Sequence, residues 1–197
     1  MKTITILIAF LLVLSYCTKK LDRTLDNDSP TASAGYTEYI IEAGAHYTSA
    51  NSYKQISGRK EIRFIAWFDS SCIYTSTNPV NQGDINKLYG FGDCSSGHQQ
   101  SSARVGWTWN GTAFDIYAYC YINDSRQWNL LGSIAPLEKA EMSITASSNK
   151  YLFKFNGKSQ VMERGCAIEQ IEGYRLYPYF GGDEVAPHRM KVYIKEL

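Results

Sequence analysis

The sequence predicts an all-β domain built from short strands. Apolar and polar residues alternate with a period of two from Tyr36 onward, and Gly, Asn, Asp and Pro separate the alternating runs. The chain of 197 residues contains 15 Tyr beside 8 Phe and 4 Trp, and aromatic side chains fit a pleated sheet. No segment has strong helical spacing with caps, apart from a turn near 136–141. Together these observations favour a sandwich or barrel of antiparallel strands.

The expected strands follow one another along the chain without an internal repeat. The alternating runs cover Tyr36–Ile41, Glu61–Asp69, Ala103–Trp109, Phe114–Ile122, Ser143–Ala146, Tyr151–Phe155 and Met190–Glu196. We therefore expect residues 36–197 to form one β-sandwich domain, and about 160 residues are enough to bury a hydrophobic core.

The N-terminus resembles a bacterial secretion signal. A lysine at position 2 precedes an apolar run from Ile4 to Leu14, which is too short to span a membrane comfortably. Leu14-Ser15-Tyr16-Cys17 resembles the lipobox of bacterial lipoproteins, in which the cysteine is acylated and becomes the mature N-terminus, although Tyr16 replaces the usual small residue. We expect residues 1–17 to be a lipoprotein signal peptide and Cys17 to carry the lipid.

The segment after Cys17 is polar. Residues 18–35 contain Asp, Ser, Thr, Pro and Gly without apolar periodicity, so we expect a flexible tether. The protein would then be exported and anchored in the cell envelope, on a membrane face that the sequence leaves open. Lys and Arg (20) nearly balance Asp and Glu (19), which disfavours a nucleic-acid partner.

Cysteine usage fits an exported protein. Without Cys17, the remaining four cysteines are Cys72, Cys94, Cys120 and Cys166. They could form two disulfides by any of three pairings, or remain buried thiols, and their spacing does not decide between these outcomes. No CxxC pair is present, so we expect no structural zinc site.

The clearest local signal is Asn110-Gly111, which lies between two alternating runs. This dipeptide predicts a β-hairpin with a two-residue type I′ turn. Such a turn would place Trp107 opposite Phe114 and Val105 opposite Ile116. Their face of the hairpin is almost wholly apolar, so we expect it to pack in the core.

The opposite face of this hairpin is polar and aromatic. The same turn would place Arg104 opposite Tyr117 and Gly106 opposite Asp115, and the strand continues with Tyr119, Tyr121 and Asn123. Aromatic rings stack on sugar rings, while Arg and Asp bind hydroxyls or a carboxylate, so the face suits a carbohydrate. The alternative is that these side chains decorate a solvated or loop-covered sheet.

A second candidate region precedes the last expected strand. In Tyr177–His188, Asp183, Glu184 and His188 could lie on a mobile loop at the rim of the sheet, or Gly-Gly-Asp could simply form a turn. His98, in a polar loop before Arg104, is a candidate general base.

Metal sites have weaker support. The histidines at 46, 98 and 188 lack the spacing of a zinc triad. Calcium could bind Asp84 with Asn86, or Asp183 with Glu184, although neither pair has the dense spacing of an EF-hand loop. We otherwise expect no cofactor.

The domain also resembles known families. Through Ser102–Trp107, Ala118–Tyr121 and Pro178–His188, residues 36–197 resemble a family of uncharacterised lipoproteins of Gram-negative bacteria. Through Tyr179-Phe180-Gly181-Gly182, followed by the run from Met190 to Leu197, they resemble concanavalin-like jelly rolls, including alginate-lyase-type polysaccharide lyases. The latter resemblance implies a jelly-roll β-sandwich. The Gln-Ile-His triplet and the Glu after the Arg motif of those lyases are missing, so their active site is not implied.

The sequence therefore predicts an envelope lipoprotein whose domain binds a carbohydrate polymer or oligosaccharide without catalysis. The first alternative is a lyase acting on a uronate polymer, in which Arg104 neutralises the carboxylate and Tyr117 or Tyr119 protonates the leaving oxygen. In that reaction His98 or His188 would remove the C5 proton. The second alternative is a structural or assembly lipoprotein that binds a protein partner.

Overall fold

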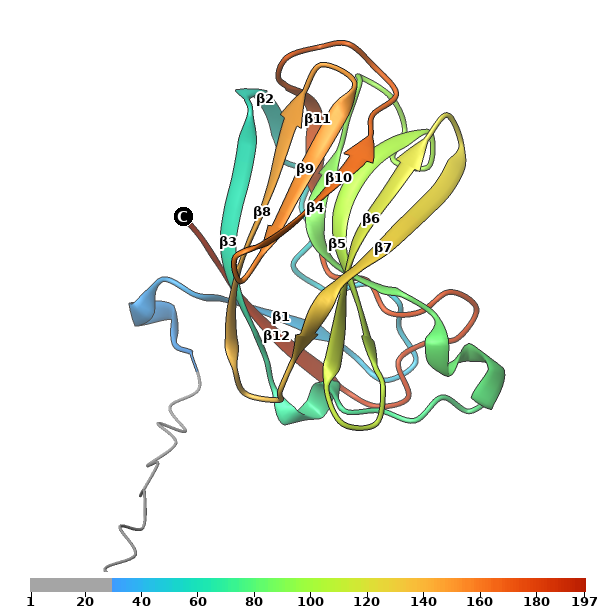
Figure 1. The fold of residues 1–197 in the computed structure, drawn as a ribbon. Helices are drawn as coiled ribbons and strands as arrows, with labels where there is room; N and C mark the ends of the chain where they lie inside the picture. Colours follow the sequence, from blue (N-terminus) through green and yellow to red (C-terminus); the bar gives the residue numbers. More distant parts are fainter. Residues whose placement is uncertain (1–29) are drawn as a thin grey trace, which may run out of the picture.

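The protein is a sandwich of two antiparallel sheets, as seen in a computed structural model that describes residues 30–197 (Figure 1). The β3 sheet has the order β1 (Thr37–Ile41), β12 (Met190–Glu196), β3 (Glu61–Phe68), β8 (Lys139–Ser147), β9 (Lys150–Phe155), β10 (Lys158–Glu163). The β5 sheet has the order β2 (Gln55–Arg59), β11 (Ile171–Leu176), β4 (Asn86–Gly92), β5 (Ser101–Trp109), β6 (Phe114–Ile122), β7 (Ser125–Ile134). This architecture confirms the prediction of an all-β jelly-roll sandwich.

Helical structure in the described part of the chain is limited to short 3-10 turns. They are η1 (Ala32–Ala34), η2 (Ser70–Cys72) and η3 (Pro79–Gly83). No helix among residues 30–197 is long and apolar enough to span a membrane. The predicted signal peptide, Cys17 and the tether as far as residue 29 lie outside the described residues.

The core lies between the two sheets, where the inward side chains of both meet. Phe68 of β3 stacks on Phe114 of β6, with 4.7 Å between ring centroids, and also contacts Trp107 of β5 at 5.2 Å. All three side chains are buried. Burying each large apolar side chain contributes about 1.5–3 kcal/mol, so this aromatic cluster helps to fix the two sheets against each other.

The predicted register of the β5–β6 hairpin is wrong by two residues. Trp107 pairs with Ile116 rather than Phe114, and Trp109 pairs with Phe114, so the connecting loop contains the four residues 110–113. Asn110 stabilises this wider loop: its side-chain Oδ1 accepts hydrogen bonds from the backbone N–H groups two and three residues later, at 3.0 and 2.9 Å.

The assignment of side chains to the two faces is nevertheless confirmed. Side chains alternate along a strand, so a shift of two residues leaves each one on its face. Val105 and Cys120 point into the core, while Arg104 shares the outer face with Tyr119, its cross-strand partner. Arg104 therefore lies opposite Tyr119 and not opposite Tyr117.

One disulfide joins two loops beside the β5 sheet. Cys94, two residues after the end of β4, is bonded to Cys166, which lies between β10 and β11. The other two cysteines of the described chain, Cys72 and Cys120, are buried thiols. Burial raises the pKa of both thiols, so they remain protonated.

A buried ion pair supports the same loops. The Asp93 carboxylate accepts hydrogen bonds from Arg164 Nε at 2.8 Å, from the Tyr151 hydroxyl at 2.8 Å and from the Glu172 backbone at 3.0 Å. Both ionic side chains are fully buried. A buried ion pair with this many hydrogen bonds fixes geometry, because loss of either partner leaves an uncompensated charge.

Candidate binding site

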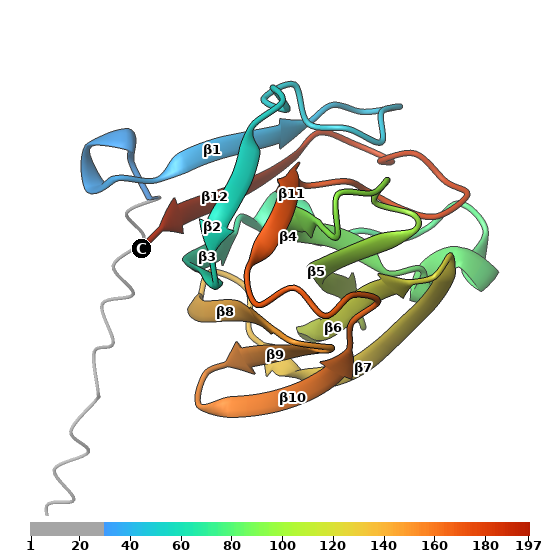
Figure 2. The same ribbon diagram turned by 90° about the horizontal axis from the view of Figure 1, so that it is seen from above.

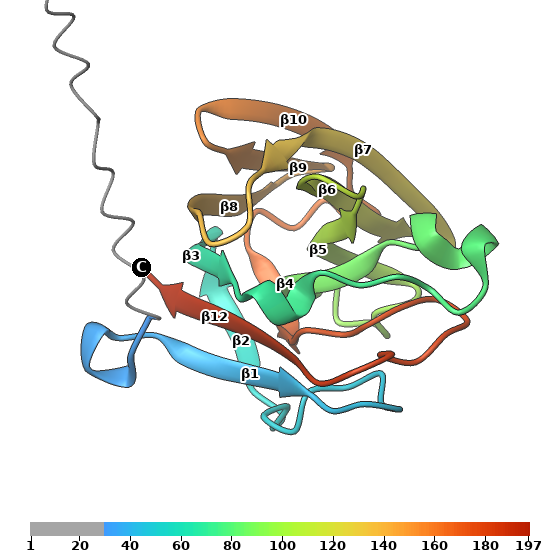
Figure 3. The ribbon, with the colours of Figure 1, turned by 90° about the horizontal axis from the view of Figure 1, so that it is seen from below.

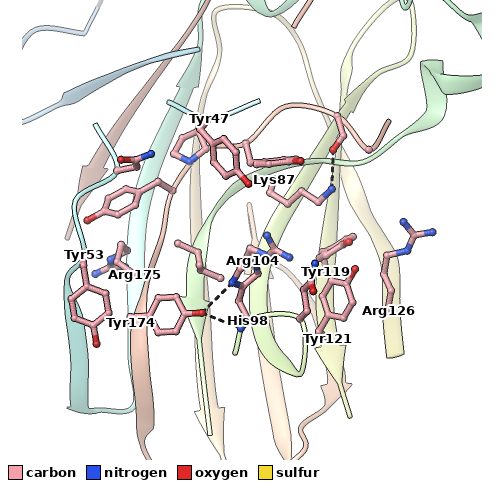
Figure 4. A pocket seen from close by; sticks show the side chains of 18 of the residues that line it. Tyr47, Tyr53, Lys87, His98, Arg104, Tyr119, Tyr121, Arg126, Tyr174 and Arg175 are labelled. Atoms are coloured by element: carbon pink, nitrogen blue, oxygen red, sulfur yellow. Dashed lines mark hydrogen bonds between the residues drawn. The ribbon is translucent and has the colours of Figure 1, made fainter. Parts of the chain in front are cut away.

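A pocket of about 510 Å³ lies on the outer face of the β5 sheet (Figure 4). Its floor is formed by side chains of β4, β5, β6 and β11. Its walls come from the segments 42–54 and 177–189, which run side by side past the sheet (Figures 2 and 3) and pair through Tyr47 and Tyr179. The lining includes Tyr47, Tyr53, Lys87, His98, Arg104, Tyr119, Tyr121, Arg126, Tyr174, Tyr179 and Asp183.

Arg104 is a buried cation without a counter-ion. Its residue surface is 7% exposed, and it forms no ion pair with a carboxylate of residues 30–197. Its Nε has no hydrogen-bond partner among these residues. The two other buried arginines of the described chain differ in their ion pairing: Arg164 pairs with Asp93, and Arg175 pairs with Glu196, although the Arg175 nitrogens also lack well-formed hydrogen bonds.

Two tyrosine rings hold the Arg104 guanidinium. Its Cζ lies 5.2 Å from the ring centroid of Tyr119 and 6.0 Å from that of Tyr121. Burial lowers the pKa of Arg104, while the neighbouring tyrosines act in the opposite direction. The side chain remains charged at physiological pH because arginine is not deprotonated in proteins. Burial also raises the pKa of Tyr119 to about 12, so that this phenol stays protonated.

Glycine at position 90 makes room for Arg104. The two residues are cross-strand partners in β4 and β5. A methyl group on Gly90 would lie 2.6 Å from the Cα and 2.8 Å from the Cγ of Arg104. The arginine can therefore lie across β4 only because its partner has no side chain.

Gly92 has the same role for an aromatic residue. A methyl group on Gly92 would lie 2.9 Å from the ring of Tyr174. Tyr174 pairs with Gly92 between β11 and β4, and its ring covers the position left free by the glycine. The glycines of β4 thus allow side chains of both neighbouring strands to lie flat on the sheet.

Lys87 adds a second cation to the pocket. Its Nζ donates a hydrogen bond to the carbonyl of Gly181 at 3.0 Å and lies 5.3 Å from the ring centroids of both Tyr119 and Tyr179. Burial lowers the pKa of Lys87 to about 8, and repulsion by Arg104 and Arg126 acts in the same direction. Lys87 could not be recognised from the sequence because β4 is buried along its whole length and shows no alternation.

His98 reaches the pocket from the loop that the disulfide holds. Its Nδ1 lies 3.0 Å from the hydroxyl oxygen of Tyr174, and its backbone N–H donates to the same oxygen at 3.0 Å (Figure 4). Burial lowers the pKa of His98, and the positive charge of Arg104 adds to this effect. The imidazole is therefore neutral at neutral pH, when it can accept a proton.

Exposed aromatic rings line the rim of the pocket. Tyr53 is 75% exposed and stacks on Tyr174, with 5.8 Å between centroids. Tyr47, which is also exposed, meets the edge of Tyr179 at 4.9 Å. Large rings that remain this accessible offer flat apolar surfaces to a ligand.

Arg104, Tyr119, Tyr121, His98 and Asp183 come together in the pocket, and the four other candidate residues lie elsewhere. The Asp115 carboxylate accepts hydrogen bonds from Asn110 Nδ2 at 2.9 Å and from the Ser133 hydroxyl at 2.5 Å. The Tyr117 hydroxyl lies 3.3 Å from that of Thr108. These two residues support the far end of the hairpin.

Glu184 and His188 stabilise loops. Glu184 accepts hydrogen bonds from the backbone N–H groups of Thr77 and Asn78, at 2.9 and 2.7 Å, and from Asn81 Nδ2 at 2.9 Å. These hydrogen bonds lower the pKa of Glu184. His188 Nε2 lies 2.8 Å from the carbonyl oxygen of Ser71.

The residues considered for calcium are largely engaged within the protein. Asn86 donates a hydrogen bond to the Tyr74 hydroxyl at 3.0 Å and accepts one from the backbone of Gly181 at 2.5 Å. Asp84 and Asp183 lie close together: the Asp183 backbone N–H donates to Asp84 at 3.5 Å. The calcium alternative remains a prediction.

Several solved structures share the fold of this chain. The alginate lyase from Alteromonas sp. 272 superposes with a TM-score of 0.50 at 9% identity, covering 86% of this chain and 89% of that one. A functionally unknown protein from Saccharomyces cerevisiae gives 0.52 at 8% identity, covering 85% and 89%. Alginate lyase A1-II′, of polysaccharide lyase family 7, gives 0.50 at 7% identity, covering 81% and 77%. At such low identity these matches show the fold alone.

Sequence comparisons identify no relative of this chain. No protein-family model matches the chain, and no curated protein does. The resemblance to a lipoprotein family therefore gains no support from them, whereas the resemblance to concanavalin-like jelly rolls is confirmed for the fold.

Proposed function

We propose that the domain binds an acidic carbohydrate in the pocket on the outer face of the β5 sheet. The observation that carries this proposal is the unpaired, buried guanidinium of Arg104. A buried charge is costly unless an opposite charge pairs with it, and an incoming carboxylate would supply that charge. Arginine is also suited to bidentate recognition of a carboxylate.

The electrostatics of the pocket support an anionic ligand. Lys87 and Arg126 line the same pocket as Arg104, and neither forms an ion pair with a residue of 30–197. Among the lining residues, Asp183 is the acidic side chain, so basic side chains outnumber acidic ones in the pocket. The excess of cations would attract a polyanion and would be screened by salt.

The aromatic rings at the rim of the pocket indicate that the anionic ligand is a sugar. Tyr47 and Tyr53 offer exposed rings, and the volume of about 510 Å³ lies within the usual range of ligand sites. A sugar acid combines an apolar ring face with hydroxyls and a carboxylate. Rings, hydrogen-bonding groups and cations in one pocket match these three properties.

A binding experiment tests the proposal. Titration of the purified full chain with alginate or polygalacturonate should give saturable binding that weakens with added salt, whereas the neutral glucan laminarin should not bind. Arg104→Gln should weaken binding roughly 30-fold, because loss of one partner of a buried charge pair costs about 2 kcal/mol or more. Lys154→Gln, on the β3 sheet, is the matched control for the loss of one charge. Absence of binding to every polymer would reject the proposal and favour the role with a protein partner.

A lyase is the second candidate, and the contact between His98 and Tyr174 favours it. The neutral His98 imidazole could take the C5 proton of a uronate whose carboxylate is neutralised by Arg104. The electron pair of that C–H bond would form the C4–C5 double bond, the C4–O bond would break, and a phenol such as Tyr119 would protonate the leaving oxygen. The non-catalytic role is preferred because the motifs of the known lyases are missing.

Absorbance of the unsaturated sugar ends separates these two candidates. A lyase gives a steady rise in absorbance with a uronate polymer, which His98→Ala abolishes while binding persists. A binding protein gives no rise under conditions in which the polymer is bound.

We further propose that the protein acts outside the cytoplasm, anchored through a lipid on Cys17. The disulfide between Cys94 and Cys166 supports export, because such bonds persist mainly in oxidising compartments. Fractionation of the producing cells should recover the protein with membranes, and Cys17→Ala should release it into the soluble fraction. Recovery of both forms in the soluble fraction would reject the anchor.

A further inference from the structure

We infer that the binding site continues across the edge strand β7 into a second subsite, formed by Arg126 and Trp128, and that the ligand is a linear acidic polymer with residues in both places. The inference rests on the proposed function and specifies its ligand. Trp128 pairs with Tyr119, and Arg126 pairs with Tyr121, across the β6–β7 ladder. Cross-strand partners point to the same face, so both side chains continue the floor of the pocket.

A separate cavity lies at this position. It has a volume of about 140 Å³, and its lining includes Asp84, Ile85, Tyr119, Arg126 and Trp128. Tyr119 and Arg126 also line the main pocket, so the two cavities adjoin. Neighbouring strands are about 4.8 Å apart, which is close to the length of one sugar ring in a polymer.

The two side chains of the subsite have the chemistry that a sugar acid needs. The Arg126 guanidinium lies 5.1 Å from the ring centroid of Trp128 and forms no ion pair with a described residue. Trp128 is 48% exposed, although tryptophan is among the side chains whose burial is most favourable. An indole would stack on a sugar ring while the guanidinium pairs with its carboxylate.

An acidic group in the lining of the small cavity adds selectivity. Asp84 lines the small cavity, and its carboxylate accepts a hydrogen bond from the Asp183 backbone. This carboxylate would repel a small free anion but would accept hydrogen bonds from sugar hydroxyls. The subsite should therefore prefer a polymer residue, in which hydroxyls and a carboxylate occur together, over inorganic anions.

The position of the subsite at a sheet edge favours a polymer over a single sugar. β7 is the outermost strand of the β5 sheet (Figure 1), so no further strand of that sheet lies beyond Trp128. At the opposite end of the pocket, the exposed ring of Tyr53 stacks on Tyr174 of β11. A chain lying across the strands would meet aromatic rings at both ends and the buried Arg104 between them.

Oligouronates of defined length test the inference. The full chain and its variants are titrated calorimetrically with alginate oligomers from two to eight residues. Trp128→Ala should weaken binding of the longer oligomers about tenfold and leave the dimer within about twofold, since tenfold corresponds to the loss of one good contact. Arg126→Gln, whose side chain also lines the main pocket, should weaken binding at every length and that of the longer oligomers most. Trp128→Phe should restore most of the affinity because it retains a stacking ring. Val161→Ala, an exposed apolar site on the edge strand β10, is the matched control.

The outcomes separate this inference from the proposed function. If Trp128→Ala binds every length as the parent does while Arg104→Gln loses affinity at every length, the subsite is rejected and the main pocket stands. If the parent binds neither these oligomers nor the acidic polymers of the first binding experiment, both are rejected. If Trp128→Ala instead abolishes a concentration-dependent self-association in sedimentation, the exposed indole belongs to a protein interface, which also rejects the subsite.

Discussion

The guanidinium of Arg104 lies over the ring of Tyr119, at 5.2 Å from its centroid, and pairs with no carboxylate of residues 30–197. The cation–π contact replaces part of the lost hydration, but it does not neutralise the charge. The pocket therefore keeps a buried positive charge that a ligand can neutralise.

Replacement of Arg104 by methionine should stabilise the fold while it removes ligand binding. The unpaired charge pays a desolvation penalty that an apolar chain of similar length avoids, so we expect the free energy of unfolding to rise by about 1 kcal/mol. Urea denaturation followed by circular dichroism measures the change. Arg164→Met is the contrasting variant: it leaves Asp93 buried without its partner and should destabilise by about 3–5 kcal/mol. A loss of stability in Arg104→Met would contradict the view that its charge is uncompensated.

Gly90→Ala should disrupt both the sheet and the site. The added methyl would lie 2.1 Å from the carbonyl oxygen of Ala103 and 2.6 Å from the Cα of Arg104, so the backbones of β4 and β5 must separate. Overpacking of this kind costs about 1–3 kcal/mol. Thermal unfolding measures the loss, with Gly97→Ala as the control, because a methyl at Gly97 meets no atom within 4 Å. Equal stability of the two variants would show that β4 tolerates a side chain there.

Binding of a uronate should weaken as the pH rises through the pKa of Lys87, which burial lowers to about 8. Below this value the amine is charged and attracts the carboxylate, and above it the amine is neutral. Arg104 keeps its charge throughout, and His98, whose pKa is lowered, is neutral over the whole interval. Titrations at pH 7 and pH 9 should therefore differ, and Lys87→Met should remove most of the difference. Binding that tightens with rising pH would reject the role of Lys87.

The disulfide between Cys94 and Cys166 should contribute substantially to stability. It joins residues 72 positions apart, and closing a loop of that length in the unfolded chain corresponds to about 4 kcal/mol. Cys94→Ala should therefore lower the midpoint of urea unfolding. Cys120→Ala, which removes a buried thiol, is the control with one fewer cysteine. The prediction fails if the two variants unfold at the same urea concentration.

The fold and the two faces of the hairpin could be predicted because they depend on local periodicity. The register could not, because Asn110 forms a wider loop through its own side chain where Asn-Gly usually forms a two-residue turn. Lys87 was also beyond prediction, since a strand buried on both faces shows no alternation. Glu184 and His188 are residue types that often occur in binding sites. Their structural role depends on Asn78 and Ser71, which are about a hundred residues away in sequence, so it could not be predicted from the local segment.

The pocket is built partly from strands and partly from connecting segments, and these two parts tolerate amino-acid changes differently. The cations Lys87 and Arg104 are fixed on strands, while the rim tyrosines Tyr47, Tyr53 and Tyr179 lie on connecting segments. Insertions and substitutions are tolerated far better in connecting segments than within a sheet. Under the proposed function, a descendant of this domain could therefore alter its sugar preference through its loops and still require an acidic sugar.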